Sequence, residues 1–353
     1  DDGRPWLAGL PIVVKDLVDV KGVRTTKGSL IHKDRVAEVS DILVDRLEER
    51  GAVVLGKSNT PEFGAGAHTF NEVFGMTRNP WDLTKSAGGS SGGSAAALAS
   101  GQVWLATGSD FGGSLRNPAS FCSVVGFRAS PGRVPRGPRT HSFGTMSIEG
   151  PMARTVADAA MMFDCQTGDH PLDPLSLPAP EVPFSATLES APPPVRIGYS
   201  PDLGGITPVA GAVRDILAAA ISSLQRSGFD VVEAAPDFND ANEIFAVLRA
   251  EQFVTNFGQL LDSHPGALKP DIVWNIEQGR KLSADDIGRA ERGRSKLFHR
   301  VAQWFEDFDL LLCPAAIVPP FDAEERYVNQ VDGNTFDNYS QWMAICYAIT
   351  LTG

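Results

Sequence analysis

Short apolar runs bounded by turn residues alternate with segments of helical periodicity along this chain, and this alternation does most to narrow the folds open to it. Residues 11–14 are predicted to form a buried strand. Ser40 is the expected N-cap of a helix that ends at Gly51, and residues 52–55 are expected to form the next strand. This order of elements is typical of α/β folds.

The same pattern continues through the rest of the chain. Helices are expected from Thr155, from Pro208 to Gly228 and over residues 283–306 with Ser283 as N-cap, and strands over residues 195–199, 230–233 and 310–313. A Pro-, Ser- and Ala-rich segment, residues 171–194, is predicted to be an extended connection. It joins a core of about residues 5–165 to a more variable half of about residues 195–353, within one expected domain over residues 1–353.

Composition narrows the class of protein. The chain has 353 residues, 42% of them hydrophobic, which is enough to bury a large core. A net charge of -12 argues against a nucleic-acid partner, because a phosphate-binding surface needs an excess of Lys and Arg. No stretch reaches the roughly 20 apolar residues of a membrane helix. The four cysteines are far apart in sequence and lack metal-ligand spacing, so buried thiols and a cytoplasmic location are expected.

Two glycine- and serine-rich runs, residues 88–94 and 109–114, carry the chemistry. Glycines adopt the positive φ angles that let backbone N–H groups converge on one point, and such a nest binds an anion or a developing oxyanion. Ser114 directly follows Gly112 and Gly113, which would place a hydroxyl beside those donors, as acyl transfer requires.

A serine hydroxyl needs a base to take its proton. Lys15 ends the first predicted strand, where burial would lower the pKa of its amine and make the neutral form available. A strand-end lysine that reaches solvent is the alternative. His68 and His141 are the histidines nearest the two runs, so a Ser-His-Asp triad stays open, although the G-x-S-x-G pattern is absent around Ser114.

Three segments resemble, in order and approximate spacing, the catalytic blocks of the amidase signature family. They are Val-Val-Lys-Asp around Lys15, the run over residues 88–94, and Asp-Phe-Gly-Gly-Ser-Leu-Arg-Asn-Pro-Ala over residues 110–119. Residues 56–63, 77–81 and 150–154 also resemble that family. The resemblance implies one α/β domain with a mixed central sheet flanked by helices, and an amidase that hydrolyses carboxylic amides to an acid and ammonia or an amine.

The resemblance also implies a role for each matching residue. Lys15 matches the base, Ser114 the acylated nucleophile, and Ser90 a proton relay that follows a cis peptide bond with Gly89. Phe111, Gly112 and Gly113, with Ser114, match the oxyanion hole, and Asp110, Arg116 and Ser91 match supporting positions. Ser91 has the alternative of a helix cap, and Ser94 is expected to cap the helix that starts near Ala95.

No metal ion or organic cofactor is implied, and the expected partner is a small amide substrate rather than nucleic acid or a membrane. A homodimer is compatible with the sequence. Two other functions stay open: a glutaminase subunit of a tRNA-dependent amidotransferase, although those subunits usually carry Gln where this chain has Asn117, and a catalytically silent scaffold. Relative to the family, the chain is expected to lack N-terminal helices and a C-terminal portion.

Two further patterns carry less weight. Residues 51–58 match the phosphate-binding pattern G-x-x-x-x-G-K-S, but their middle positions are predicted to be a strand, which cannot form a flexible nest, so ATP binding is not expected. Phe143, Trp342 and Met343 are candidates for an apolar wall of the substrate pocket, with core packing as the favoured role of each.

Overall fold

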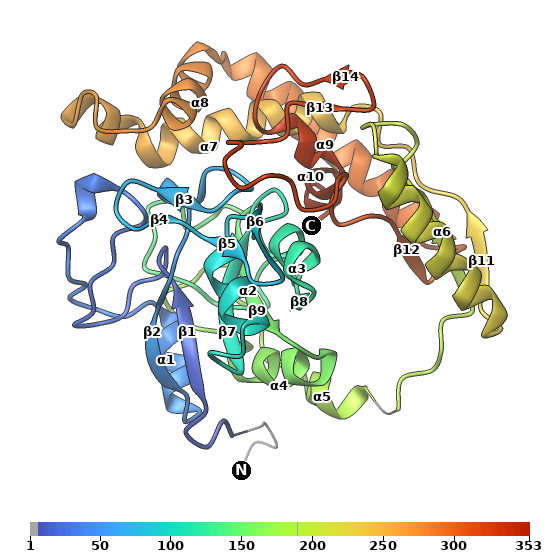
Figure 1. The fold of residues 1–353 in the computed structure, drawn as a ribbon, viewed down its shortest axis with the longest axis horizontal. Helices are drawn as coiled ribbons and strands as arrows, with labels where there is room; N and C mark the ends of the chain where they lie inside the picture. Colours follow the sequence, from blue (N-terminus) through green and yellow to red (C-terminus); the bar gives the residue numbers. More distant parts are fainter. Residues whose placement is uncertain (1–5, 189) are drawn as a thin grey trace. The chain divides into compact units, whose positions relative to one another are not determined.

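The computed structural model describes residues 6–188 and 190–353, drawn in Figure 1. The described chain forms two compact units. The first runs to Ala191 and also contains His264–Lys269 and Asp322–Arg326. The second contains Pro192–Ser263, Pro270–Phe321 and Tyr327–Gly353. The division therefore falls within the Pro-rich segment, residues 171–194.

A five-stranded sheet forms the centre of the first unit, in the order β2-β1-β7-β9-β8. Strand β1 runs parallel to both β2 and β7, whereas β9 runs antiparallel to β7 and β8, so the sheet is mixed as predicted. The strands are β1 (Pro11–Lys15), β2 (Val53–Ser58), β7 (Leu105–Asp110), β8 (Val125–Gly126) and β9 (Ile148–Ala153).

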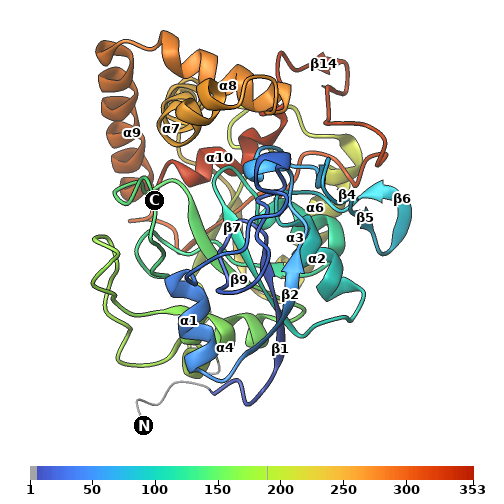
Figure 2. The same cartoon turned by 90° about the vertical axis from the view of Figure 1, so that its left-hand side faces the viewer.

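Helices cover both faces of this sheet because side chains alternate along its strands (Figure 2). In β1, Ile12 and Val14 pack in the apolar core under α1 and α4, while Val13 packs in the core under α2 and α3. The helices are α1 (Ile42–Glu49), α2 (Gly92–Ala99), α3 (Arg116–Cys122) and α4 (Val156–Gln166).

The second unit has a three-stranded parallel sheet in the order β11-β10-β12 and five helices. Helix α7 packs against α8 and α9. The elements are β10 (Arg196–Tyr199), β11 (Asp230–Glu233), β12 (Leu310–Leu312), α6 (Gly211–Arg226), α7 (Ala241–Ser263), α8 (Pro270–Lys281), α9 (Ala284–Trp304) and α10 (Ala344–Thr350).

Short elements complete the described chain. Three two-stranded ribbons pair β3 with β4, β5 with β6 and β13 with β14. The bounds are η1 (Leu30–His32), η2 (Glu62–Gly64), β3 (Phe70–Asn71), β4 (Gly75–Met76), β5 (Arg78–Asn79), β6 (Asp82–Ser86), α5 (Phe184–Thr187), β13 (Gln330–Val331), β14 (Asn334–Thr335) and η3 (Gln341–Met343).

Two of the predicted helix caps are confirmed and two are wrong. Thr155 and Ser283 cap α4 and α9 through their side chains, as predicted. The prediction for Ser40 is wrong, because Asp41 caps α1 by accepting from the Leu43 N–H. The prediction for Ser94 is also wrong, because α2 already begins at Gly92. Helix α6 begins at Gly211, three residues beyond the predicted Pro208.

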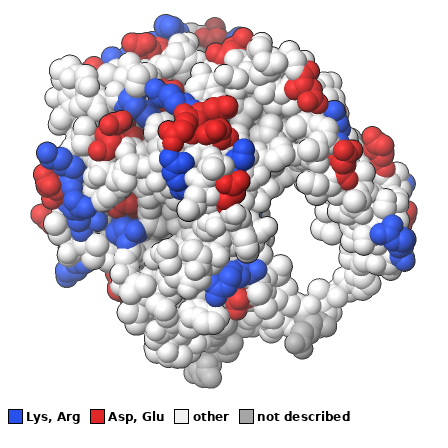
Figure 3. Space-filling view, viewed as in Figure 1, with Lys and Arg blue, Asp and Glu red and all other residues white. Residues whose placement is uncertain are grey.

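The surface carries charges of both signs. On the face drawn in Figure 3, the basic and acidic side chains of the described residues are interspersed rather than gathered in a continuous basic stripe. Within the described part of the chain, no helix is long and apolar enough to cross a membrane. No group of three or more His, Cys, Asp or Glu side chains is arranged to hold a metal ion among the same residues.

Candidate active site

The candidate site lies where β1 and β7 end. These strands are parallel neighbours, so their carboxyl ends meet at the same edge of the sheet. Lys15 is the last residue of β1 and Asp110 the last of β7. Ser90 and Ser91 directly precede α2, and Ser114 lies between β7 and α3. The two glycine- and serine-rich runs are thereby brought to the end of the strand that carries Lys15.

Lys15 is fully buried among hydroxyl groups. Its Nζ lies 2.7 Å from Ser90 Oγ, 2.8 Å from Ser91 Oγ and 2.9 Å from Ser109 Oγ. Burial lowers the pKa of the amine to about 7, against the smaller opposing effects of the Glu149 and Asp110 carboxylates. A substantial share of Lys15 is therefore neutral near pH 7. The alternative of a lysine that reaches solvent is wrong.

The segment before α2 is held by close packing against His68 and by hydrogen bonds to neighbouring segments. The Gly89–Ser90 peptide bond is cis. A Cβ on Gly89 would stand 2.8 Å from the His68 backbone nitrogen, which explains why a residue without a side chain is needed there. The Gly89 N–H donates to Asn117 Oδ1 at 3.2 Å. The Ser91 N–H donates to the Ser114 carbonyl at 3.2 Å, which ties this segment to the loop of Ser114.

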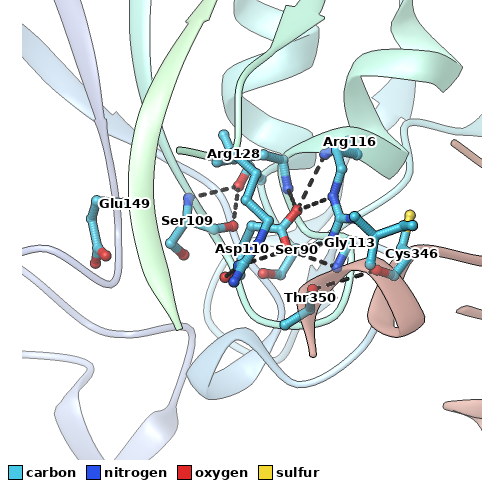
Figure 4. Close-up of polar contacts among 12 residues, drawn as sticks. Ser90, Ser109, Asp110, Gly113, Arg116, Arg128, Glu149, Cys346 and Thr350 are labelled. Carbon is cyan, nitrogen blue, oxygen red and sulfur yellow. Dashed lines mark hydrogen bonds and ion pairs between the residues drawn. The ribbon is translucent and has the colours of Figure 1, made fainter. Parts of the chain in front are cut away.

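Asp110 organises the loop that carries Ser114. Its fully buried carboxylate accepts from the Gly113 N–H at 2.9 Å and from the Leu115 N–H at 3.0 Å. Figure 4 shows Arg116 and Arg128 converging on this carboxylate. Arg116 Nη2 lies 2.8 Å from Oδ1. Burial acts to raise the pKa of Asp110, but the two guanidinium groups and the backbone donors hold it well below its usual range. The carboxylate is therefore ionised throughout the neutral range.

These contacts bear on the predicted oxyanion hole. The Gly113 N–H, one of the expected donors, is engaged by Asp110 Oδ1. Phe111, Gly112 and Ser114 lie in the same turn between β7 and α3. Ser114 is buried, with 9% of its surface exposed.

Three residues of the site have no role of their own predicted from the sequence. Ser109 contacts Lys15 through both its hydroxyl and its carbonyl oxygen, and Arg128 is a second cation on Asp110. Glu149 is a buried carboxylate in β9, directly opposite Ser109. Its signal in the sequence is a single acidic residue inside an otherwise uncharged strand, where a buried charge calls for a partner.

His68 lies close to the site but serves other groups. Its Nδ1 lies 2.8 Å from Ser86 Oγ, and its Nε2 lies 2.8 Å from the Ala323 carbonyl oxygen. Burial lowers the pKa of this imidazole. With both ring nitrogens engaged in these contacts, His68 is not placed to serve as the base of Ser114.

The three candidate wall residues differ in exposure. Trp342 and Met343 are buried within the second unit, with 1% and 6% of their surfaces exposed, which agrees with the favoured role in core packing. Phe143 is 73% exposed, so the favoured core role is wrong for this residue.

Comparison with known proteins places the chain in a family. The sequence profile of the Amidase family matches residues 1–353. An acylamidase of Rhodococcus erythropolis is 33% identical over 93% of this chain and 69% of its own length. One component of the glutamyl-tRNA(Gln) amidotransferase of Thermus thermophilus is 35% identical over 91% of this chain and 72% of its own length.

Solved structures agree with the sequence comparison. The crystal structure of a bacterial aryl acylamidase of the amidase signature enzymes superposes with a TM-score of 0.90. It is 28% identical, and the match covers 99% of this chain and 75% of that one. The chain therefore belongs to the amidase signature family, whose members named here include hydrolases of carbon–nitrogen amide bonds.

Proposed function

We propose that this protein hydrolyses carboxylic amides through an acyl-enzyme on Ser114, with Ser90 as proton relay and Lys15 as base. The observation that carries the proposal is the fully buried Lys15 amine, whose pKa of about 7 and three hydroxyl neighbours suit a base that works at neutral pH. A buried lysine costs folding stability, and its role as a base explains why it is present at this position.

The surroundings of Lys15 favour Ser90 as its proton donor. A neutral amine has two N–H groups and one lone pair. The Ser91 hydroxyl is within reach of the Ser109 carbonyl oxygen at 3.3 Å and, when it donates there, accepts from Lys15. Ser109 Oγ accepts the second N–H. The lone pair then faces Ser90 Oγ at 2.7 Å.

The reaction follows in two halves. In the first, Lys15 takes the Ser90 proton while Ser90 takes the Ser114 proton, and Ser114 Oγ attacks the amide carbonyl. The N–H groups of Phe111, Gly112 and Ser114 are the proposed donors to the tetrahedral oxyanion, and Gly113 is left out of the expected set because its N–H donates to Asp110 Oδ1. Ser90 then protonates the leaving nitrogen as the carbon–nitrogen bond breaks, Lys15 returns its proton to Ser90, and ammonia or an amine departs.

In the second half, water replaces the leaving group. Ser90 and Lys15 remove a proton from the attacking water, which adds to the acyl carbonyl. Collapse of the second tetrahedral intermediate breaks the ester bond and returns the proton to Ser114 Oγ. The products are a carboxylic acid and the free enzyme, so the relay is restored for the next cycle.

The relatives favour N-acylated amines as the substrate class. Two similar proteins are named as an acylamidase and an aryl acylamidase. The test is a panel of anilides, aliphatic primary amides and glutamine, with acid and amine or ammonia measured together. Added hydroxylamine should divert the acyl group to a hydroxamate at the expense of the acid. Amide hydrolysis without hydroxamate formation would argue against an acyl-enzyme.

The glutaminase component of an amidotransferase is the second candidate. Its support is the 35% identity with the glutamyl-tRNA(Gln) amidotransferase chain of Thermus thermophilus, while Asn117 at the position where Gln is usual speaks against it. Glutamine hydrolysis that requires an added partner chain, together with inactivity toward anilides, would favour this candidate over the first.

Assembly and location are open to simple measurements. A homodimer is proposed, and its mass in light scattering would be twice that of the chain. The cytoplasmic location is proposed from the four cysteines, which are far apart in sequence and lack metal-ligand spacing, and cell fractionation tests it.

A further inference from the structure

Glu149 lies on the strand next to Ser109, which is one of the hydrogen-bond partners of the Lys15 amine. In the antiparallel pair of β7 and β9, Glu149 stands directly opposite Ser109, and residues in that relation project from the same face of a sheet. Ser109 Oγ is itself 2.9 Å from Lys15 Nζ. Glu149 is 2% exposed, and its Oε2 has no hydrogen-bond partner.

Two arginines hold this carboxylate in place. Arg139 forms an ion pair and a hydrogen bond with Oε1, and Arg136 Nη1 lies 4.0 Å from Oε2. Burial acts to raise the pKa of Glu149, but Arg139 and Arg136 lower it overall, so the group is an anion at neutral pH. Neighbouring Asp41 has its pKa raised to about 6, chiefly by burial.

The other carboxylates near Lys15 are more completely matched. Asp110 is paired with both Arg116 and Arg128 and accepts two further backbone hydrogen bonds. Asp16, the residue after Lys15, accepts from Thr26 and lies 3.4 Å from Lys57 Nζ. One oxygen of Glu149 accepts no hydrogen bond. The negative charge of Glu149 is therefore less offset than that of Asp110 or Asp16 and acts more strongly on the Lys15 amine.

We propose that the Glu149 carboxylate, oriented by Arg139 and Arg136, is a positioning residue that keeps the buried Lys15 amine basic enough to accept the proton of Ser90. The proposal rests on the proposed function of Lys15. Burial favours the neutral amine, and a buried anion opposite Ser109 on the neighbouring strand counteracts this by stabilising the ammonium form that arises when Lys15 accepts a proton. Of the two carboxylates that raise the pKa of Lys15, Glu149 has the larger effect.

The test is the pH dependence of Ser114 labelling by a fluorophosphonate, which needs no knowledge of the substrate. The labelling rate should rise with pH as Lys15 loses its proton. In Glu149→Gln, which keeps the shape and removes the charge, this rise should move to lower pH by at least about half a unit. Opening of the site to water would instead move it to higher pH, toward the ordinary lysine value, so the direction separates electrostatics from structural damage.

Matched variants complete the test. Glu149→Asp keeps the charge and should restore a profile close to that of the wild type. Arg139→Gln removes the cation that offsets the charge of Glu149, so the rise of the labelling rate should move to higher pH. Arg139→Lys keeps the cation and should leave the rise where it is. This pair decides the matter if Glu149→Gln does not fold. Unchanged profiles in folded Glu149→Gln or Arg139→Gln would overturn the proposal.

A reference variant separates this proposal from the proposed function. Lys15→Met should remove the rise with pH and slow labelling strongly. If Lys15→Met labels with the wild-type profile, Lys15 is not the base and the proposed function fails. If Lys15→Met behaves as expected while the Glu149 and Arg139 variants do not move the profile, only the role of Glu149 is wrong.

Discussion

At the scale of single residues, burying the Lys15 amine in the site lowers the stability of the fold. Its amine has an ordinary pKa of 10.5, which burial lowers to about 7. Between those two pH values the unfolded chain holds a proton that the folded chain does not, so the contribution of Lys15 makes the fold more stable as pH rises. Below pH 7 the folded protein must bury an ammonium group, and the full destabilisation applies.

The buried amine determines how Lys15→Met should behave. We expect the variant to lose activity and to be more stable than the wild type at pH 7, by up to a few kcal/mol, because one pKa unit corresponds to about 1.4 kcal/mol. The advantage should shrink as pH rises from 7 toward 10. Urea unfolding at several pH values measures it. A variant that is less stable at pH 7, or an advantage that does not depend on pH, would contradict the buried amine.

Asp110 gives a second prediction at this scale. Asp110→Asn keeps the shape but leaves Arg116 and Arg128 without their anion, and breaking such a buried pair costs about 3–5 kcal/mol. Labelling of Ser114 should fall as well, because the carboxylate holds the Gly113 and Leu115 N–H groups of its loop. Chemical denaturation and probe labelling measure the two effects.

The control for Asp110→Asn is Asp262→Asn. Asp262 pairs with Arg280 at 2.7 Å, but both side chains are largely exposed. Ion pairs of that kind contribute at most about 1 kcal/mol. Equal losses of folding stability in the two variants would show that Asp110 contributes no more to stability than an exposed carboxylate.

At the scale of elements, the turn before α2 depends on glycine for two separate reasons. Gly88 has a φ of +73°, and a Cβ there would stand 2.7 Å from Asn117 Oδ1 and 2.9 Å from Pro118 Cα. Gly101, after α2, has a φ of +75° and open space around it. The two glycines share a backbone conformation and differ in their surroundings.

This comparison predicts unequal effects of alanine. Gly101→Ala should lose only the roughly 1–2 kcal/mol of a left-handed alanine and keep its labelling rate. Gly88→Ala should lose more stability and also slow the labelling of Ser114, because the clash with α3 displaces the segment of Ser90. Thermal melts and labelling rates of both variants test this. Matching results for the two would show that backbone conformation alone explains the requirement at Gly88.

Local sequence signals predict β1, β2, β10, β11, β12 and helices α1, α2, α4, α6 and α9, but not β7, β9, α7 or α8, and they predict the ends less well. Thr155 and Ser283 are predictable because a cap and its helix are adjacent in sequence. The prediction for Ser94 fails because its hydroxyl bonds to Ser58 and to the Thr107 carbonyl, partners 36 and 13 residues away. Ser40 and Asp41 are both good capping residues, and only the observed backbone selects the second.

At the scale of the whole molecule, the site joins segments that are distant in sequence. The family resemblance identifies the segments of Lys15, Ser90 and Ser114 from the sequence alone. The positions of Ser109 and Glu149 relative to Lys15 follow from the register of β7 on β9, which the sequence does not determine. The Asp110 contact of the Gly113 N–H likewise depends on a folded loop.

The predicted single domain is also a question at this scale. The described chain forms two compact units that divide at Ala191, and the expectation of one domain stays a prediction. One cooperative domain should unfold in a single calorimetric transition whose calorimetric and van't Hoff enthalpies agree. Two resolved transitions would show that the units unfold independently and would contradict the single domain.

The proposed function assigns Ser114 as the nucleophile and Lys15 as its base. Its most direct test is the mass of the intact protein after fluorophosphonate treatment, for the wild type and for folded Ser114→Ala and Lys15→Ala variants. We expect one adduct on the wild type, none on Ser114→Ala and much slower labelling of Lys15→Ala. An adduct that persists on Ser114→Ala, or no adduct on the folded wild type, would contradict it.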